Sequence, residues 1–136
     1  MKSIKRVNWI EGVPKPRASY SSLVRAGDFV FTAGHVGMDP ETGKIAKQLE
    51  AQLHIIFKTI KKLLESEGGS LDDVVKTTTF LTDASYHETY DKIYRSYFKN
   101  GYPARSTVQT KLMHPDFKAE IEAVAYIPKK NRQTLK

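Results

Sequence analysis

The chain has 136 residues, of which 40% are hydrophobic and 27% charged, and it contains no cysteine. This length predicts one domain with a single core, and the missing cysteines exclude disulfides, thiolate metal ligands and a cysteine nucleophile. No apolar run approaches the ~20 residues that span a bilayer, and the amino terminus lacks the apolar stretch of a secretory signal. We therefore expect a cytoplasmic protein with no membrane partner.

The net charge of +7 comes from the two ends of the chain. Seven basic side chains and no acidic one lie within residues 1–8 and 129–136, so residues 9–128 are neutral overall. A nucleic-acid interface usually gathers its basic residues on one face of the folded domain. We therefore expect no nucleic-acid partner, and we interpret residues 129–136 as a flexible, solubilising tail.

The first third of the sequence predicts three strands. Extended runs cover residues 3–9, 20–25 and 29–34, and glycine and proline residues separate the first two. Ala26-Gly27-Asp28 predicts a hairpin turn between the second and third strands.

Two helices and three further strands follow. Leucine and isoleucine recur every three or four residues over 45–67, which predicts an amphipathic helix that Gly68-Gly69 ends. β-Branched residues predict a strand over 74–82. Ser85-x-x-Glu88 has the form of a capping box and predicts a second helix. The apolar stripe of that helix consists of Tyr86, Tyr90, Ile93 and Tyr97. The last two predicted strands cover residues 104–112 and 119–127.

The resulting order, βββαβαββ, predicts an α+β fold in which two helices cover one face of a mixed sheet. Phe29-Val30-Phe31, Val74-Val75 and Phe80-Leu81 nevertheless place apolar side chains on both faces of their strands. Because no third layer is encoded, we expect another subunit to cover the second face. The alternative is a partly solvated sheet with its apolar pairs at strand ends.

No motif for a metal or a nucleotide is present. The four histidines, His35, His54, His87 and His114, are isolated and lack the spacing of a shared metal site. No nucleophile elbow, P-loop or dinucleotide-binding glycine motif occurs. We therefore expect no metal site and no nucleotide-binding site.

Five segments, in their joint order and spacing, resemble the RidA/YjgF family of reactive-intermediate deaminases, also called the endoribonuclease L-PSP family. The strongest match is Tyr102-Pro103-Ala104-Arg105-Ser106-Thr107-Val108, and the others are 27–34, 39–43, 72–83 and 120–125. The resemblance implies one chorismate-mutase-like domain over residues 1–136. It also implies a homotrimer with ligand sites in the clefts between subunits, and a reaction without a cofactor.

The resemblance also implies roles for individual residues. Arg105 would bind the substrate carboxylate, and Glu120 would position or activate the attacking water. Tyr20, Asp91 and backbone groups at Gly34 and Thr107 are the further substrate-binding residues by the same resemblance, with Asp91 standing where the family often has asparagine. Without the resemblance, Arg105 and Glu120 are exposed strand residues.

A geometric argument separates Arg105 from Glu120. If the last two strands form a simple hairpin around residues 113–118, Lys111 lies opposite Glu120, and Arg105 lies about 20 Å further along. Two groups so far apart cannot hold one small substrate. We therefore expect the two residues of one site to come from different chains.

The implied function is hydrolysis of small imine or enamine acids, similar to 2-aminoacrylate, to ketoacids and ammonia. The family's S-G-Q is Ala33-Gly34-His35 here, and Thr107 replaces its common cysteine, which therefore cannot be an essential nucleophile. Lys15-Pro16-Arg17 is similar to members that act on 2-aminomuconate, a second enzymatic interpretation. An RNA-directed translation inhibitor or endoribonuclease, and a non-catalytic trimer that binds small carboxylates, remain as alternatives.

Overall fold

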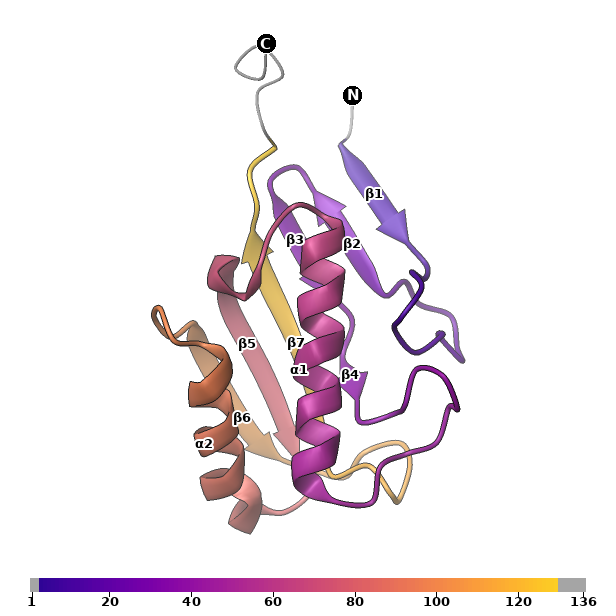
Figure 1. The fold of residues 1–136 in the computed structure, drawn as a ribbon, viewed down its shortest axis with the longest axis vertical. Helices are drawn as coiled ribbons and strands as arrows, with labels where there is room; N and C mark the ends of the chain where they lie inside the picture. The colour runs from indigo at the N-terminus through magenta and orange to yellow at the C-terminus, as the bar shows by residue number, and fades with distance from the viewer. Residues whose placement is uncertain (1–2, 130–136) are drawn as a thin grey trace.

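The computed structural model describes residues 3–129, in which two helices lie on one face of a mixed sheet (Figure 1). The strands are β1 (Ile4–Val7), β2 (Leu23–Ala26), β3 (Phe29–Thr32), β4 (His35–Val36), β5 (Val74–Leu81), β6 (Ala104–Gln109) and β7 (Ala119–Tyr126). The helices are α1 (Leu49–Ser66) and α2 (His87–Tyr97), with 3₁₀ turns η1 (Leu71–Asp73) and η2 (Ala84–Tyr86) before β5 and α2. The predicted α+β class is confirmed, with the short β4 as an addition.

The strand order is β1-β2-β3-β7-β5-β6, and β4 also pairs with β7. β5 and β6 are parallel because α2 connects them as a crossover, and β7 fills the other side of β5. The predicted hairpin between the last two strands is therefore wrong. Glu120 lies opposite Phe80 of β5, and Lys111 lies outside β6.

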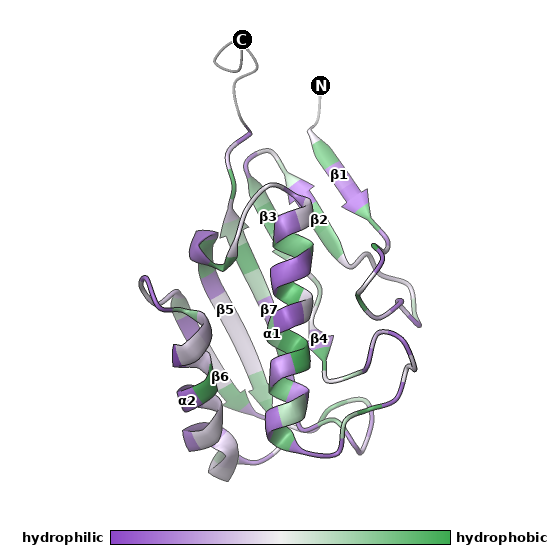
Figure 2. Cartoon of the chain, viewed as in Figure 1, coloured by the Kyte–Doolittle hydropathy of each residue, from purple (hydrophilic) through white to green (hydrophobic). Residues whose placement is uncertain are grey.

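α1 forms as predicted and supplies much of the core. Its apolar stripe buries Leu53, Ile56 and Ile60 completely or almost completely. The helix begins at Leu49, later than predicted, because Gln48 is extended and Ile45 still forms a bridge with Met38. At the other end the amide groups of Gly68 and Gly69 donate to carbonyls of the last turn, and Gly68 has the left-handed φ of 85° that this ending requires. Purple and green sides of α1 in Figure 2 show the same amphipathic pattern.

α2 packs on β5 through two buried tyrosines. The Tyr90 and Tyr94 hydroxyl groups form hydrogen bonds of 2.6 and 2.7 Å with Thr79 and Thr77 of β5. Burial raises the pKa of Tyr94 to about 12, so this hydroxyl stays protonated. The predicted capping box is wrong, because Asp83 accepts the Ser85 amide at η2 and α2 begins at His87.

The face of the sheet turned away from the helices is only half covered. Phe29 and Phe31 of β3, Val108 of β6 and Tyr126 of β7 are 42–46% exposed there. The Phe29 and Tyr126 rings, whose centroids are 5.2 Å apart, form one apolar patch. Phe29 and Phe31 are among the side chains from which the sequence predicts coverage by another subunit, whereas Val108 and Tyr126 were not part of that prediction.

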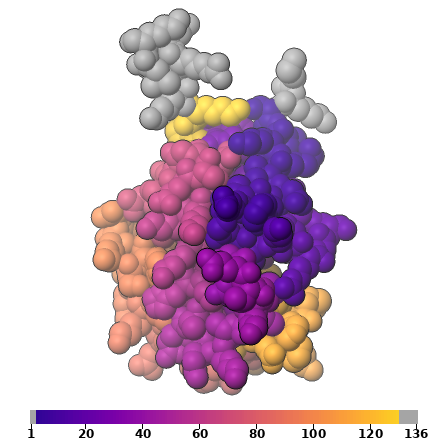
Figure 3. Space-filling model, turned by 45° about the vertical axis from the view of Figure 1, so that its right-hand side comes forward, coloured from indigo at the N-terminus to yellow at the C-terminus, as the bar shows by residue number. Residues whose placement is uncertain are grey.

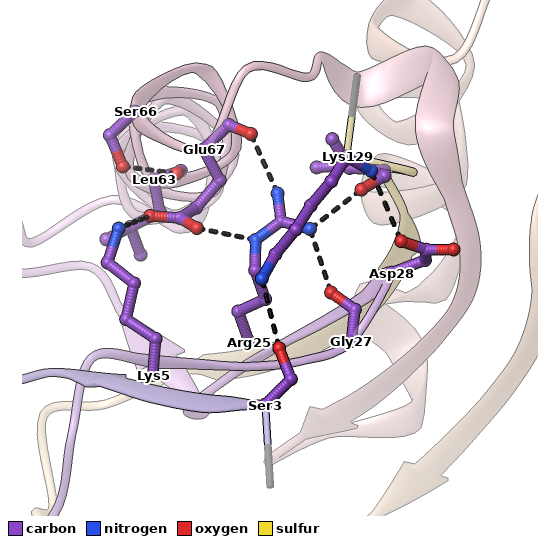
Figure 4. Close-up of polar contacts among 10 residues, drawn as sticks. Ser3, Lys5, Arg25, Gly27, Asp28, Leu63, Ser66, Glu67 and Lys129 are labelled. Atoms are coloured by element: carbon purple, nitrogen blue, oxygen red, sulfur yellow. Dashed lines mark hydrogen bonds and ion pairs between the residues drawn. The ribbon is translucent and has the colours of Figure 1, made fainter. Parts of the chain in front are cut away.

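A buried arginine ties three distant parts of the chain together (Figure 4). Arg25, 5% exposed, donates to the Glu67 carboxylate at 2.8 Å and to the Glu67 carbonyl at the end of α1. It also donates to the carbonyls of Gly27 and Ile127, at 3.1 and 2.7 Å. Lys5 donates to the other carboxylate oxygen of Glu67. The network thus fixes β1, the β2–β3 turn, the end of α1 and the end of β7 relative to one another.

The segment that follows β7 lies at the same end of the sheet as the start of β1 (Figure 1). Lys129 donates through its amide to Asp28 and through its ammonium to Ser3. Residues 130–136, the rest of the predicted basic tail, lie outside the described residues. Within residues 3–129 no helix is long and apolar enough to cross a membrane.

Candidate active site

A cavity of about 490 Å³ opens beside β4 and the first residues of β7. In Figure 3 the surface is hollowed between the purple segment that follows β3 and the orange loop that precedes β7. The cavity brings together three of the predicted site residues, Tyr20, Gly34 and Glu120. The other lining residues are Pro14, Lys15, Arg17, Ala18, Ala33, His35, Val36, Met38, Met113 and Phe117.

Glu120 is the acidic group of this cavity. It points to the face of the sheet opposite the helices, because it is paired with Phe80 and its neighbours Ala119 and Ile121 are buried in the core. Burial, and then the charge of Glu122, raise the pKa of the Glu120 carboxyl. No basic group of residues 3–129 lies within 4 Å of it as an ion-pair partner. A carboxylate with a raised pKa and no counterion is suited to accept a proton from water.

Gly34 makes room for this carboxylate. A Cβ at position 34 would lie 2.2 Å from Oε2 of Glu120. We expect Gly34→Ala to displace the carboxylate and to lower any activity that depends on Glu120 by at least about 10-fold, since misplacing a reacting group by ~1 Å is costly. Carboxyl titration by NMR should show the Glu120 pKa moving toward its ordinary value. As a contrast, Gly37→Ala, whose Cβ would meet buried Gln52, should lower the free energy of unfolding instead.

The other predicted charged residues lie on the helix side of the sheet. Arg105 of β6 donates to Asp91 of α2 at 2.9 Å, and this hydrogen bond lowers the pKa of the Asp91 carboxyl. The Arg105 guanidinium also lies over the Tyr94 and Tyr90 rings, 4.7 and 5.1 Å from their centroids. Arg95 holds the second oxygen of Asp91. These groups border a second hollow of about 240 Å³.

Thr107 follows Arg105 on the same side of β6 and is opposite Thr79 of β5. Its hydroxyl is buried and has no hydrogen-bond partner among residues 3–129. The predicted contribution of Thr107 to ligand binding is through its backbone. β6 is an edge strand, and the edge turned away from β5 pairs with no other strand of residues 3–129.

Arg105 and Glu120 do not meet within one chain. Arg105 is opposite Thr77 of β5, whereas Glu120 is opposite Phe80, on the other side of that strand. This places them about 10 Å apart along the sheet and about 10 Å across it, on opposite faces. The two groups therefore cannot hold one small substrate together in a single subunit.

His35 also borders the cavity but belongs to the core. It is opposite Ile121, is 6% exposed, and donates from Nε2 to the Ser22 carbonyl at 3.3 Å. Burial lowers the pKa of His35 to about 4, against a smaller opposite effect of the Ser22 hydrogen bond. The imidazole is therefore neutral at physiological pH.

This histidine makes stability depend on pH. The unfolded chain takes up the proton near pH 6.5, but the folded protein does so only near pH 4. The free energy of unfolding should therefore fall as the pH drops from about 6.5 to about 4, by about 3 kcal/mol in all. Urea unfolding across this range should show the decline in the wild type and much less of it in His35→Gln. His54→Gln, at an exposed histidine, should behave like the wild type, and parallel curves for wild type and His35→Gln would contradict the assignment.

Part of the cavity wall could not be found from sequence. Met113 and Phe117 come from the loop before β7, and they line the cavity together with Pro14 and Tyr20, about a hundred residues earlier. No local pattern indicates that segments so far apart in the sequence line one cavity. Within the described part of the chain, no three His, Asp or Glu side chains are grouped to hold a metal ion.

The fold and the site define a two-layer α+β protein with a small-molecule cavity on its sheet. The sequence pattern of the family described as Endoribonuclease L-PSP matches residues 11–127. The chain therefore belongs to this family, the RidA/YjgF family that the sequence resembles.

Known relatives cover almost the whole chain. RutC family protein PH0854 of Pyrococcus horikoshii is 39% identical, over 90% of this chain and 98% of its own. The 2-iminobutanoate/2-iminopropanoate deaminase of Salmonella typhimurium is 34% identical, over 85% of this chain and 92% of its own. Among solved structures, Escherichia coli TdcF with bound serine has a TM-score of 0.84 at 31% identity, covering 90% of this chain and 98% of its own.

Proposed function

We propose that this protein hydrolyses small imine or enamine acids to ketoacids and ammonia, in sites shared between subunits of a homotrimer. The observation that carries the proposal is the Glu120 carboxylate. It lines the cavity, its pKa is raised, and no counterion of residues 3–129 pairs with it. The Salmonella relative, named as a deaminase of 2-iminobutanoate and 2-iminopropanoate, supports this class of substrate.

Hydrolysis of an imine requires few catalytic groups from the protein. Water adds to the carbon of the protonated C=N bond while Glu120 accepts a proton from it, which gives a carbinolamine. Glu120 then gives the proton to the nitrogen. As the C–N bond breaks and ammonia leaves, the Glu120 carboxylate accepts the hydroxyl proton and the carbonyl forms; this proton then passes to ammonia, which departs as ammonium. The protein has mainly to hold the substrate beside a water, and the steps balance without a cofactor or metal.

Arg105 is the proposed anchor for the substrate carboxylate. Its planar guanidinium can donate two parallel hydrogen bonds to a carboxylate, which lysine cannot reproduce. Asp91 and the tyrosine rings hold the guanidinium in place. Serine, the molecule bound to TdcF, is itself a small carboxylate, which supports this ligand class.

A second subunit would complete the site. Arg105 and Glu120 lie on opposite faces of the sheet in one chain, so a shared site needs each from a different chain. The half-exposed apolar face that carries Phe31 and Tyr126 supports close packing of subunits there. Three subunits would then form three such sites.

Subunit mixing tests this arrangement. Arg105→Ala and Glu120→Gln should each be nearly inactive in an assay of ketoacid formation from an imine generated in situ. When the two variants are co-expressed and purified together through two different tags, about a quarter of the sites in randomly mixed oligomers should contain both intact residues. The mixed protein should therefore regain activity that neither parent has.

Other outcomes have distinct meanings. No recovery in proteins shown to contain both variants would contradict the shared site. Binding of a ketoacid by the wild type without turnover of any imine would favour a non-catalytic carboxylate-binding protein. A monomeric wild type, by sedimentation, would contradict the proposed assembly.

A further inference from the structure

We propose that Gln52 is a positioning residue for the substrate cavity, which holds the loop of residues 111–118 against α1 so that Met113 and Phe117 form part of the cavity wall. The kinetic side of this inference rests on the proposed function. Gln52 lies in the first turn of α1, beside that loop (Figure 1). It does not line the cavity itself, so it acts only through the residues that do.

The side chain of Gln52 is completely buried, which is unusual for a glutamine. A buried amide is normally satisfied by hydrogen bonds, and here both its hydrogens and its oxygen have partners outside α1. Nε2 donates to the carbonyl oxygens of Ala46 and Asp116, at 2.7 and 2.9 Å. Oε1 accepts a hydrogen bond of 2.8 Å from the Lys118 amide group. One side chain thus joins α1 to the segment before this helix and to the loop before β7.

The loop has few other attachments. Within the described part of the chain, the bond from Gln52 to Asp116 is the only hydrogen bond that joins residues 111–117 to the rest of the protein. The remaining hydrogen bonds of this segment are internal and go to His114. Residues 113–116 are all exposed, so burial of apolar surface contributes little there. A segment with so few buried contacts opens readily once its attachment is removed.

A second part of the cavity wall is attached to the same amide. Ala46, whose carbonyl accepts a hydrogen bond from Gln52, donates through its own amide group to the Gly37 carbonyl at 2.9 Å. Gly37 lies between Val36 and Met38, both of which line the cavity. The relative position of two parts of the wall therefore depends on one buried side chain.

Glu120 is held independently of Gln52. Its backbone is paired with Phe80 of β5 on one side and with Val36 of β4 on the other. Removing the Gln52 amide should therefore leave the proposed proton acceptor in place and loosen the wall beside it. The kinetic result should be a higher KM with a nearly unchanged kcat, because binding requires a wall position that fewer molecules then occupy.

The first test is Gln52→Met, which keeps the length and helix propensity of the side chain but removes its hydrogen bonds. KM for 2-iminobutanoate generated in situ should rise about 10-fold, as expected if about one molecule in ten retains the wall position. kcat should stay within about 3-fold of the wild type, and the acid limb of the pH profile should not move, because Glu120 is unchanged.

Hydrogen exchange measured by NMR reports the attachment directly. In Gln52→Met the exchange of the Lys118 amide should accelerate by at least about 10-fold, because this group loses its acceptor. The Thr110 amide at the other end of the loop donates to the Leu81 carbonyl, so it should keep its rate. Unchanged exchange at Lys118 would show that Gln52 does not hold the loop, and would overturn the proposal.

Ile60→Val is the matched control. It removes one methylene group from the core at another position of α1, 2% exposed, that does not line the cavity. It should lower the midpoint of urea unfolding and leave KM unchanged. An equal rise of KM in Ile60→Val and Gln52→Met would show a general effect of lost stability and would overturn the proposal. A folded Gln52→Met protein with KM within about 2-fold of the wild type would overturn it as well.

Gln52→Glu, measured at pH 8, decides the question if Gln52→Met does not fold. The ionised carboxylate has nearly the size of the amide and still accepts the Lys118 amide group, but it has no hydrogen to donate to Asp116 or Ala46. KM should again rise with kcat near that of the wild type, while the Lys118 amide stays protected from exchange. An unchanged KM would contradict the positioning role.

A binding measurement separates this inference from the proposed function. By calorimetry, Gln52→Met should bind the ketoacid 2-oxobutyrate about 10-fold more weakly than the wild type does. If this loss is seen but no imine is hydrolysed, the proposed function fails and the role of Gln52 stands. If imines are hydrolysed with an unchanged KM, the role of Gln52 fails and the proposed function stands. A wild type that neither hydrolyses an imine nor binds 2-oxobutyrate would contradict both.

Discussion

Replacing Glu120 by glutamine should reduce kcat for imine hydrolysis by about 10²- to 10⁴-fold, the usual contribution of a positioned acid–base group. The amide keeps the size of the carboxylate but cannot accept a proton from water. Burial and Glu122 raise the pKa of Glu120, so the wild-type kcat/KM should decline on the acid side with a midpoint above the ordinary value of 4.5. Initial rates of ketoacid formation from pH 4.5 to 8 measure both effects.

Glu122→Gln provides the control for this variant. Its side chain lies on the same face of β7 and contributes charge without lining the cavity. It should retain activity and shift the acid limb toward lower pH, because a negative neighbour of Glu120 is removed. If Glu120→Gln retains wild-type kcat, the proton is accepted by another group and the mechanism above is wrong.

Arg25→Ala should cost about 3–5 kcal/mol of unfolding free energy, because it leaves the Glu67 carboxylate buried beside the end of α1 without its main partner. Both side chains are at most 6% exposed. Burial alone would raise the pKa of Glu67, but hydrogen bonds and charges from Lys5 and Arg25 lower it. The stabilisation should therefore be complete above about pH 4.5 and decline as the pH falls below that value. Urea unfolding at pH 7 and pH 4 tests both parts.

The double variant Arg25→Met/Glu67→Met is the informative comparison. It removes both charges, so it should recover part of the stability that Arg25→Ala loses. Lys5→Ala should have a small effect, since that ammonium is largely exposed, at 61%. A loss below about 1 kcal/mol in Arg25→Ala would show that water replaces the guanidinium at little cost.

Local patterns predicted the elements of this fold better than their arrangement. The apolar stripe of α1 and the existence of strand β3 depend on neighbouring residues, and both were predicted correctly. The order of strands depends on which strand edges remain free after α2 crosses over. β5 lies between β6 and β7, whereas the sequence argument paired the last two strands as a hairpin. The capping box failed for a smaller reason, because Asp83 competed for the Ser85 amide.

The candidate site shows the same division. Arg105 and Glu120 came from the family resemblance, since their local sequence marks them only as strand residues. The hairpin used to separate them was wrong, yet the pairing with β5 separates them by another route, through opposite faces. Arg25 was not predicted to be buried, because an arginine in a short strand is normally solvated and three of its four acceptors come from distant segments.

The position of Arg105 on the edge strand has a consequence for variation. Among the strands of residues 3–129, β6 is hydrogen-bonded only to β5, so the sheet holds this strand on one side. The guanidinium takes its orientation from α2, through Asp91 and the Tyr94 ring, with Arg95 balancing the charge of Asp91. α2 thus holds the side chain of Arg105, the proposed carboxylate-binding residue, in position. Natural variants that retune substrate affinity should accordingly accumulate on this helix, among side chains that never touch the ligand.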